Sequence, residues 1–224
     1  MKATKWKSYS LALIAGMSVL TACSSDDNND NGGNGNNGNG NEIENGTTLK
    51  GTITSDVTLT AGSTYKLSGE YIVEDGATLN IEAGVKIISI YDDIVDYILV
   101  KQGGKINAVG TSSAPIVMTS EKEEPGAWGG IHICGKAHTN AEGGKGSSEI
   151  GGATYGGNDD ADNSGTLKYV RVEYSGYAFD SEHEANGITF YGVGNGTTVE
   201  YCQAYKGSDD GFEFFGGSVN VSNL

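Results

Sequence analysis

The chain has 224 residues, a formal net charge of −15 at pH 7 and a pI of about 4.4. This charge argues against nucleic acid and anionic lipid surfaces as partners, because both attract Lys and Arg side chains. Glycine is abundant, with 36 residues, whereas proline occurs twice. This composition argues against long helices and, without a Gly-X-Y repeat, against collagen, so we expect an all-β domain.

Residues 1–22 have the organisation of a processing signal. Three lysines precede the apolar run Leu11–Leu20, which is too short to cross a bilayer because a spanning helix needs about 20 residues. The run ends in Leu20-Thr21-Ala22-Cys23, which resembles the lipobox of bacterial lipoproteins. On that resemblance Cys23 becomes the acylated N-terminus and anchors the chain to the outer membrane. The alternative is an ordinary secretory signal that happens to precede a cysteine.

Residues 23–46 form the predicted linker between this anchor and the folded domain. From Ser24 to Asn41 the linker lacks the apolar residues that would offset the entropy of ordering, so we expect disorder. Asp26 and Asp27 resemble the export signal of surface lipoproteins in Bacteroidetes. This resemblance predicts a position facing the extracellular side of the outer membrane, and the alternative is a merely soluble spacer.

Strand patterns begin near Thr47 and recur along the chain. Val57–Gly62, Leu79–Gly84 and Ile106–Gly110 each alternate apolar residues and then end in a glycine turn. They follow one another at offsets of about 22 and 27 residues, which lie within the range of solenoid repeats. A short strand that recurs between glycine corners predicts a β-solenoid over residues 47–224.

A second repeat consists of the hexapeptides Gly130–Gly135, Gly187–Gly192 and Gly211–Gly216. All three read glycine, apolar, any residue, apolar, apolar, glycine. Because side chains of a strand alternate between its two sides, the repeat predicts an inward and an outward set. The inward set contains Phe190, Phe212 and Phe214, and the outward set contains His132, Thr189 and Glu213. The segment from Lys136 to Gly165 is expected to leave the stack as a long loop.

Five segments together resemble a family of surface lipoproteins common in Bacteroidetes. They are Asp75–Gly84, Trp128–Ile131, Leu167–Gly176, Gly192–Thr197 and Asp209–Glu213. The resemblance implies a single-stranded, right-handed parallel β-helix and no established activity. Members of the family are usually longer, and no capping element follows the last strand pattern. We therefore expect the chain to be an N-terminal fragment that continues past Leu224.

Acidic residues precede each hexapeptide. They are Glu121, Glu123 and Glu124 before the first, Asp180, Glu182 and Glu184 before the second, and Asp209 and Asp210 before the third. If equivalent strands stack about 4.8 Å apart, these residues form an acidic row along one edge. Closely spaced carboxylates repel each other unless a cation lies between them, and oxygen ligands favour Ca²⁺. The row therefore predicts a calcium-lined groove, with a solvated acidic rim as the alternative.

A second candidate calcium loop contains Asp159, Asp160 and Asp162. Its sequence matches the opening of an EF-hand loop, but Arg171 occupies the place of the closing glutamate and no flanking helices are predicted. An EF-hand is therefore rejected. A looser calcium loop and a plain polar turn remain as the two alternatives.

Asp209 and Asp210 are also the candidate catalytic residues. They resemble the paired aspartates of β-helical polysaccharide hydrolases, in which one carboxyl group protonates the leaving oxygen and the other activates water. A lyase would instead need a basic residue as proton acceptor, and Arg171 is the only arginine. Because Arg171 lies between two valines of a strand pattern, it is expected to point outward, where a lone arginine is usually solvated or ion-paired.

The aromatic and cysteine residues of the second half carry two further expectations. Tyr155 and Tyr177 lie in predicted loops and are the candidate contacts for sugar rings. Cys134 and Cys202 fall in different coils, so we expect buried free thiols rather than a disulfide.

These patterns predict a surface-exposed outer-membrane lipoprotein that acts as a non-catalytic binding or structural module. Its expected partners are an extracellular polysaccharide or a surface protein, with calcium as the one expected cofactor. The alternative is a polysaccharide-degrading lyase or glycoside hydrolase with part of its site beyond residue 224.

Overall fold

The computed structural model describes residues 41–180 and 183–224. The predicted signal at 1–22, Cys23, most of the linker and Glu182 lie outside these residues. Within them, no helix has the length and apolar character required to cross a membrane.

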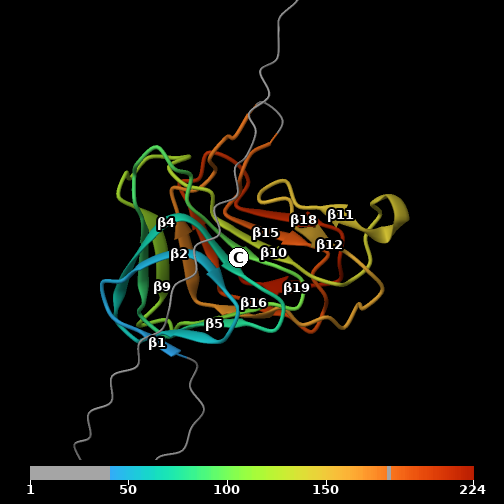
Figure 1. Cartoon of the computed structure of the whole chain (residues 1–224), viewed down its shortest axis with the longest axis horizontal. Coiled ribbons are helices and arrows are strands. Elements are labelled where there is room, and N and C mark those ends of the chain that lie inside the picture. Colours follow the sequence, from blue (N-terminus) through green and yellow to red (C-terminus); the bar gives the residue numbers. More distant parts are fainter. Residues whose placement is uncertain (1–40, 181–182) are drawn as a thin grey trace, which may run out of the picture. The chain divides into compact units, whose positions relative to one another are not determined.

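One parallel sheet of seven strands forms the first side of the structure, which we call face A (Figure 1). Its strands, in spatial order, are β1 (Asn41–Ile43), β3 (Val57–Leu59), β5 (Thr78–Ile81), β8 (Lys105–Val109), β13 (Gly165–Lys168), β16 (Thr198–Glu200) and β19 (Asn220–Ser222). The register pairs Val57 with Leu79 and Leu79 with Ile106, so the two offsets predicted from the sequence are confirmed.

A ten-stranded sheet bends to form two more sides because its long strand β4 (Thr64–Val73) pairs with different neighbours along its length. The part up to Leu67 pairs with β6, and the part from Glu70 pairs with β7. Gly69 lies between the two parts with a φ of 70°, a left-handed conformation that glycine adopts without strain. The strand β2 (Thr48–Ile53) pairs with β4 along both parts.

We call these two sides face B and face C. Face B continues from β4 through β6 (Lys86–Ser89), β9 (Ile116–Ser120), β14 (Val170–Glu173) and β17 (Gln203–Tyr205). Face C continues through β7 (Tyr97–Val100), β10 (Ile131–Cys134), β15 (Ile188–Tyr191) and β18 (Phe212–Phe215). The chain visits faces A, B and C in turn and then returns to A, so the predicted parallel β-helix is confirmed.

The three hexapeptides stack on one another in face C. Ile131 pairs with Ile188, and Ile188 pairs with Phe212. Phe190 is fully buried in the core and stacks on Phe214 with ring centroids 5.1 Å apart. Phe214 remains 44% exposed, because β18 is the last strand of face C in this chain. The predicted inward set therefore lies on the core side.

The start of the solenoid differs from the sequence-based boundary. The strand β1 pairs in register with β3, from Asn41 opposite Val57 to Ile43 opposite Leu59. Residues 41–46 therefore belong to the solenoid, and the expectation that they are linker is wrong. The backbone hydrogen bonds of a parallel ladder place this polar segment in the first coil even though it contains few apolar side chains.

The predicted long loop leaves the stack after β10 and returns at β13. It contains a 3-10 turn, η1 (Glu142–Gly144), and an antiparallel pair, β11 (Gly146–Ser147) and β12 (Thr154–Tyr155). Ala153 and Tyr155 pack on the outer side of face C, against Leu99, Cys134 and Tyr191. We call this segment, residues 135–164, the insertion.

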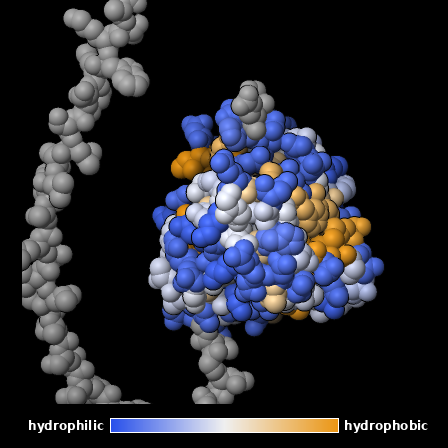
Figure 2. Space-filling view, turned by 90° about the vertical axis from the view of Figure 1, so that its right-hand side faces the viewer, coloured by the Kyte–Doolittle hydropathy of each residue, from blue (hydrophilic) through white to orange (hydrophobic). Residues whose placement is uncertain are grey.

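Because the insertion covers the outer side of face C, the outward residues of the first two hexapeptides are buried. His132 and Thr189 alternate with inward residues as predicted, yet both are fully buried. The His132 ring lies between those of Tyr97 and Tyr191, each with its centroid 6.2 Å away. Elsewhere the surface is polar: Figure 2 shows hydrophilic residues over most of the visible face, with apolar groups in small patches.

A buried carboxyl group holds the corner between faces B and C. Asp96 is 1% exposed, and its Oδ1 accepts a hydrogen bond from the Gly69 N–H. Its Oδ2 has no hydrogen-bond partner. Burial raises the pKa of Asp96 from its ordinary value of 3.8 to about 6. The folded chain thus holds this proton more tightly than the unfolded chain, so stability falls as pH rises from about 4 to about 6.

We expect Asp96→Asn to raise the melting temperature above about pH 7 and to leave it unchanged near pH 4. The amide keeps the acceptor for Gly69 and removes the charge that is costly to bury. For a chain of this size each kcal/mol shifts the melting temperature by about 2–4 °C, which scanning calorimetry resolves. Asp93→Asn, an exposed carboxyl group of the same loop, is the control. An unchanged pH dependence in Asp96→Asn would contradict this role.

Candidate ligand-binding site

Four loops join face B to face C in successive coils and stack on one another. They are the loops 90–96, 121–130, 174–187 and 206–211, which we call the corner loops. Backbone hydrogen bonds connect each loop to the next. The Gly129 N–H donates to the Asp96 carbonyl at 2.7 Å, and the N–H groups of Gly126 and Ser208 donate to the Ser175 carbonyl at 3.0 Å. The corner is thus built with the same regular spacing as the strands.

Trp128 fixes the second corner loop to the core. Its side chain is 1% exposed, and its indole N–H donates to the Glu173 carbonyl at 2.7 Å. Trp128 also forms a parallel bridge with Ser175 of the next coil. The large buried ring and its satisfied N–H hold this loop in place beneath the surface residues that follow.

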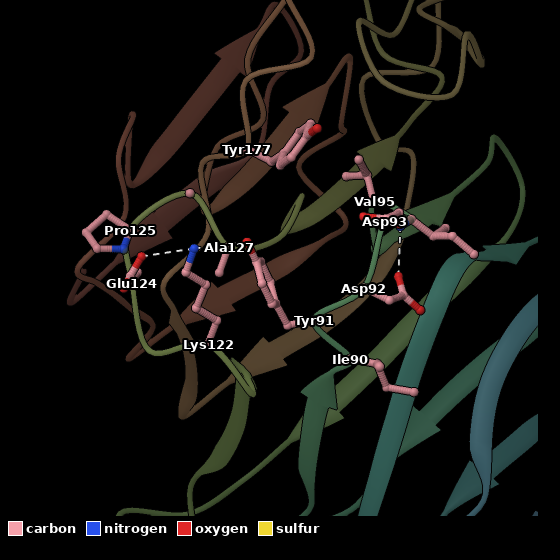
Figure 3. A pocket seen from close by; sticks show the side chains of 12 residues that line it. Ile90, Tyr91, Asp92, Asp93, Val95, Lys122, Glu124, Pro125, Ala127 and Tyr177 are labelled. Atoms are coloured by element: carbon pink, nitrogen blue, oxygen red, sulfur yellow. Dashed lines mark hydrogen bonds and ion pairs between the residues drawn. The ribbon is translucent and has the colours of Figure 1, made fainter.

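A pocket of about 320 Å³ opens among the first three corner loops (Figure 3). Residues 90–95 line one side, Lys122 and residues 124–127 line another, and Tyr177 completes the lining. Tyr91 is 56% exposed, and the Lys122 ammonium lies over its ring, 4.4 Å from the centroid. The prediction that Tyr177 is positioned to contact a ligand fits this placement.

Hydrogen bonds and an ion pair hold the polar side chains of this pocket in place. The Lys122 ammonium donates to the Tyr91 hydroxyl at 3.0 Å and pairs with Glu124 at 3.0 Å. The hydrogen bond to Tyr91 and the contact with Glu124 raise the pKa of Lys122. Asp92 Oδ1 accepts a hydrogen bond from the Ile94 N–H at 2.8 Å, which fixes the first corner loop. The pocket combines aromatic surface with both hydrogen-bond donors and acceptors.

A second pocket, of about 240 Å³, lies beside the insertion. Its lining includes Tyr97 of face C, Glu149 and Ile150 of the insertion, and Phe179 of the third corner loop. Tyr177 and Phe179 are in edge-to-face contact with centroids 5.1 Å apart. Because Tyr177 lines the first pocket and Phe179 the second, this aromatic pair connects the two pockets.

Five carboxylates interact electrostatically, and one of them, Glu149, lines the second pocket. They are Glu149, Glu184, Asp209, Asp210 and Glu213, which we call the acidic cluster. Burial raises the pKa of Glu149, and the charges of Glu184 and Asp209 raise it further. Burial and the charges of Glu149, Asp210 and Asp209 raise the pKa of Glu213, while the Asn186 amide donates to its Oε2. Burial is the larger cause of both shifts, and the neighbouring negative charges add to it.

Sequence reasoning missed Glu149. Nothing in the sequence of the insertion indicates that it folds back over face C, because its two strands are short and its residues are mostly small and polar. Glu213 was expected to point outward, but a partner from a distant part of the chain could not be derived from strand alternation. The acidic cluster exists only once the insertion is packed on the solenoid.

Only some residues of the predicted acidic row interact with one another, and others form ion pairs with basic residues. Glu121 pairs with Lys66 at 2.8 Å and Glu124 with Lys122, whereas Glu184, Asp209 and Asp210 belong to the acidic cluster. Asp180 pairs with His183 at 2.9 Å. In the described part of the chain, no three or more His, Cys, Asp or Glu side chains are grouped so that they could hold a metal ion. Calcium stays a prediction without an assembled ligand set there.

The second candidate calcium loop forms a polar turn. Asp160 pairs with His138 at 2.6 Å, and hydrogen bonds from the His138 backbone and ring lower the pKa of Asp160. Asp159 Oδ1 accepts a hydrogen bond from the Ala161 N–H at 3.1 Å. Asp162, 8% exposed, accepts a hydrogen bond from the Ser164 hydroxyl at 3.1 Å. These contacts fit the polar-turn alternative.

Arg171 lies on the outer side of face B, as predicted. Its Nε is 2.6 Å from Glu173 Oε1, and its guanidinium carbon lies 4.3 Å from the centroid of the Tyr205 ring. It lines neither of the two pockets. Asp209 and Asp210 are exposed in the last corner loop. An ion-paired and stacked arginine is a poor proton acceptor, so the lyase variant of the alternative function gains no support here.

Tyr155 and the two cysteines of the domain, Cys134 and Cys202, are all buried. Tyr155 is only 7% exposed, because its ring packs 5.2 Å from that of Tyr191, so the expectation of an exposed sugar contact is wrong. Cys134 and Cys202 are buried free thiols, as predicted. Burial raises the pKa of Cys134 to about 12 and that of Cys202 to about 11, which makes both thiols unreactive.

The fold and the corner loops together define a parallel β-helix protein with stacked loops and two pockets beside one of its corners. Residues 51–224 match the model of a family described as pectate-lyase-like β-helix domains, and the chain belongs to this family. The predicted membership of a β-helix family is confirmed at this level. Neither the curated proteins nor the solved structures that were compared with the chain contain a match.

Proposed function

We propose that the chain is a surface-exposed outer-membrane lipoprotein that binds an extracellular saccharide at its corner loops without cleaving it. The observation that carries this proposal is the pocket between Tyr91 and Tyr177, in which aromatic surface lies beside Lys122, Glu124 and Asp92. Sugar rings offer apolar faces to aromatic side chains and hydroxyl groups to such polar neighbours. The volume of about 320 Å³ is at the lower end of the range for small-ligand sites.

The stacked loops support a polymer as the ligand. Successive coils are spaced by the regular strand repeat, so equivalent loops present their side chains in a row along the corner. The Tyr177–Phe179 pair extends the aromatic surface from the first pocket to the second. A surface protein remains the other partner class predicted from the sequence.

One observation favours the alternative, a polysaccharide-degrading enzyme. Burial raises the pKa values of Glu149 and Glu213, and the charge of Glu149 raises that of Glu213 further, as expected of carboxyl groups that share a site. Catalysis would also require an ordered constellation around the cleaved bond, and Arg171 is engaged elsewhere. Release of new reducing ends from a bound polysaccharide would favour the enzyme.

The lipid anchor and export to the cell surface are supported by residues 1–46 alone. The apolar run Leu11–Leu20 and the lipobox-like ending at Cys23 support acylation, and Asp26 with Asp27 supports export in a bacterium of the Bacteroidetes. A saccharide-binding module gains from such an anchor, because the anchor keeps the module next to polymers outside the cell.

Affinity electrophoresis in gels that contain single polysaccharides tests the saccharide proposal. We expect retardation by at least one polysaccharide, and Tyr177→Ala and Tyr91→Ala to raise the dissociation constant about two- to tenfold, because an aromatic contact contributes about 0.5–1.5 kcal/mol. Tyr201→Ala is the control, since Tyr201 is 44% exposed but stacks on Tyr169 at another corner. The proposal would be contradicted if no polysaccharide retarded the chain, or if all three variants lost the same amount of affinity.

Labelling with a fatty acid tests the anchor. We expect the wild-type chain, expressed in a Bacteroidetes host, to incorporate the label, to partition into detergent and to be accessible to protease added to whole cells. Cys23→Ser should lose the label and the partitioning, because the serine hydroxyl cannot form the thioether link. Replacing Asp26 and Asp27 by Asn should keep the label but abolish accessibility. An unlabelled wild-type chain would show that residues 1–22 are an ordinary secretory signal.

A further inference from the structure

The two pockets beside the corner loops share one arrangement of aromatic side chains. Tyr91 and Tyr177 line the first pocket, and Tyr97 and Phe179 line the second. In each pocket one aromatic residue comes from the first corner loop or the strand that follows it, and the other comes from the third corner loop. The pockets thus form two neighbouring subsites, each with aromatic surface for one part of a longer ligand.

Tyr177 and Phe179 belong to a short hairpin of the third corner loop. The Ala185 N–H donates to the Tyr177 carbonyl, and the Phe179 N–H donates to the His183 carbonyl, both at 2.9 Å. The Tyr177 N–H donates to the carbonyl of the buried Trp128 at 3.2 Å. Because residues two positions apart in an extended strand lie on the same side, both rings project from one side of the hairpin. Backbone contacts therefore position both rings, and such a preorganised surface loses less entropy on binding.

The planes of these two rings are far from parallel. Tyr177 and Phe179 are in edge-to-face contact, with an angle of 77° between their planes and centroids 5.1 Å apart. The apolar face of a sugar lies parallel to the aromatic ring on which it stacks. Two sugars of one chain that stack on these rings are therefore turned steeply relative to each other. A flat glycan, whose sugar rings all lie nearly in one plane, can stack on only one of the two rings.

The linings of both pockets contain more acidic than basic groups. The first has three carboxylates and one ammonium group, that of Lys122. The second has Glu149 in addition to the ion pair of Asp180 with His183. A glycan with a carboxylate on each sugar is repelled by this excess when no cation lies between the charges. The hydroxyl groups of an uncharged glycan can use both the donors and the acceptors of these linings.

We propose that the two pockets are consecutive subsites for an uncharged glycan with a twisted backbone. One sugar stacks on Tyr177 in the first pocket, and a sugar further along the chain stacks on Phe179 in the second after the chain has turned. Flat glycans lose one of these contacts, and acidic glycans are repelled, so the surface selects by shape and by charge. The inference rests on the proposed saccharide function and names the class of glycan that this surface takes.

Titration calorimetry of the full chain with hexasaccharides tests this inference. The twisted probes come from β-1,3-glucan, amylose and xylan, the flat probes from cellulose and β-1,4-mannan, and the acidic probe from polygalacturonate. We expect at least one twisted probe to bind about tenfold or more tightly than every flat or acidic probe. A flat or acidic probe that binds as tightly as the best twisted probe would overturn the inference and leave the saccharide proposal standing. Binding of no probe, together with no retardation in the affinity gels, would overturn both.

Variants of Phe179 test the second subsite. Phe179→Ala should weaken the best twisted probe about two- to tenfold and reduce its advantage over the flat probes, because flat probes use only one ring. Phe179→Tyr keeps the ring and should keep wild-type affinity. Phe179 is 39% exposed, so neither change should lower the melting temperature noticeably. Val109→Ala, at a residue 45% exposed on face A, is the control. Wild-type affinity in Phe179→Ala, or an equal loss in Val109→Ala, would overturn the assignment.

Discussion

The structure depends on one interaction, the in-register backbone hydrogen bonding of each strand with its equivalent in the next coil. This pairing fixes the spacing of coils and places Ile98, Ile131 and Ile188 in one buried row. A one-residue shift in register would turn the row outward, so the apolar pattern and the hydrogen bonds specify the same arrangement. Phe212 continues this row into the last coil, and Phe190 stacks on Phe214 in the neighbouring row.

The same ladder positions the candidate site, because loops of different length emerge from one corner at fixed intervals. A rigid scaffold with variable loops is a common way to present a binding surface. Here the loops supply Tyr91 and Tyr177, and the insertion supplies Glu149. The chain thus brings together residues that lie far apart in its sequence without any change in the core.

The sequence predicted those features that depend on local periodicity. The spacing of Val57, Leu79 and Ile106, the stacking of the hexapeptides and the inward Phe190 follow from alternation along strands. It did not predict features that depend on how the insertion packs. The burial of Tyr155 and His132 and the partnership of Glu149 with Glu213 arise from tertiary contacts between segments that share no repeat. Asn41 shows the converse case, because it belongs to a polar segment that pairs in register with β3 although its apolar pattern is weak.

Disulfide trapping tests the register most directly. Thr166 of β13 lies opposite Thr198 of β16, and paired residues of parallel strands are about 4.8 Å apart, within the range that a disulfide spans. Thr166→Cys with Thr198→Cys should therefore cross-link under mild oxidation and keep a cooperative melting transition. Thr166→Cys with Glu200→Cys, about 8 Å apart on the same side of the sheet, should remain reduced. Cross-linking of the second pair in preference to the first would contradict the stacked coils on which the site is built.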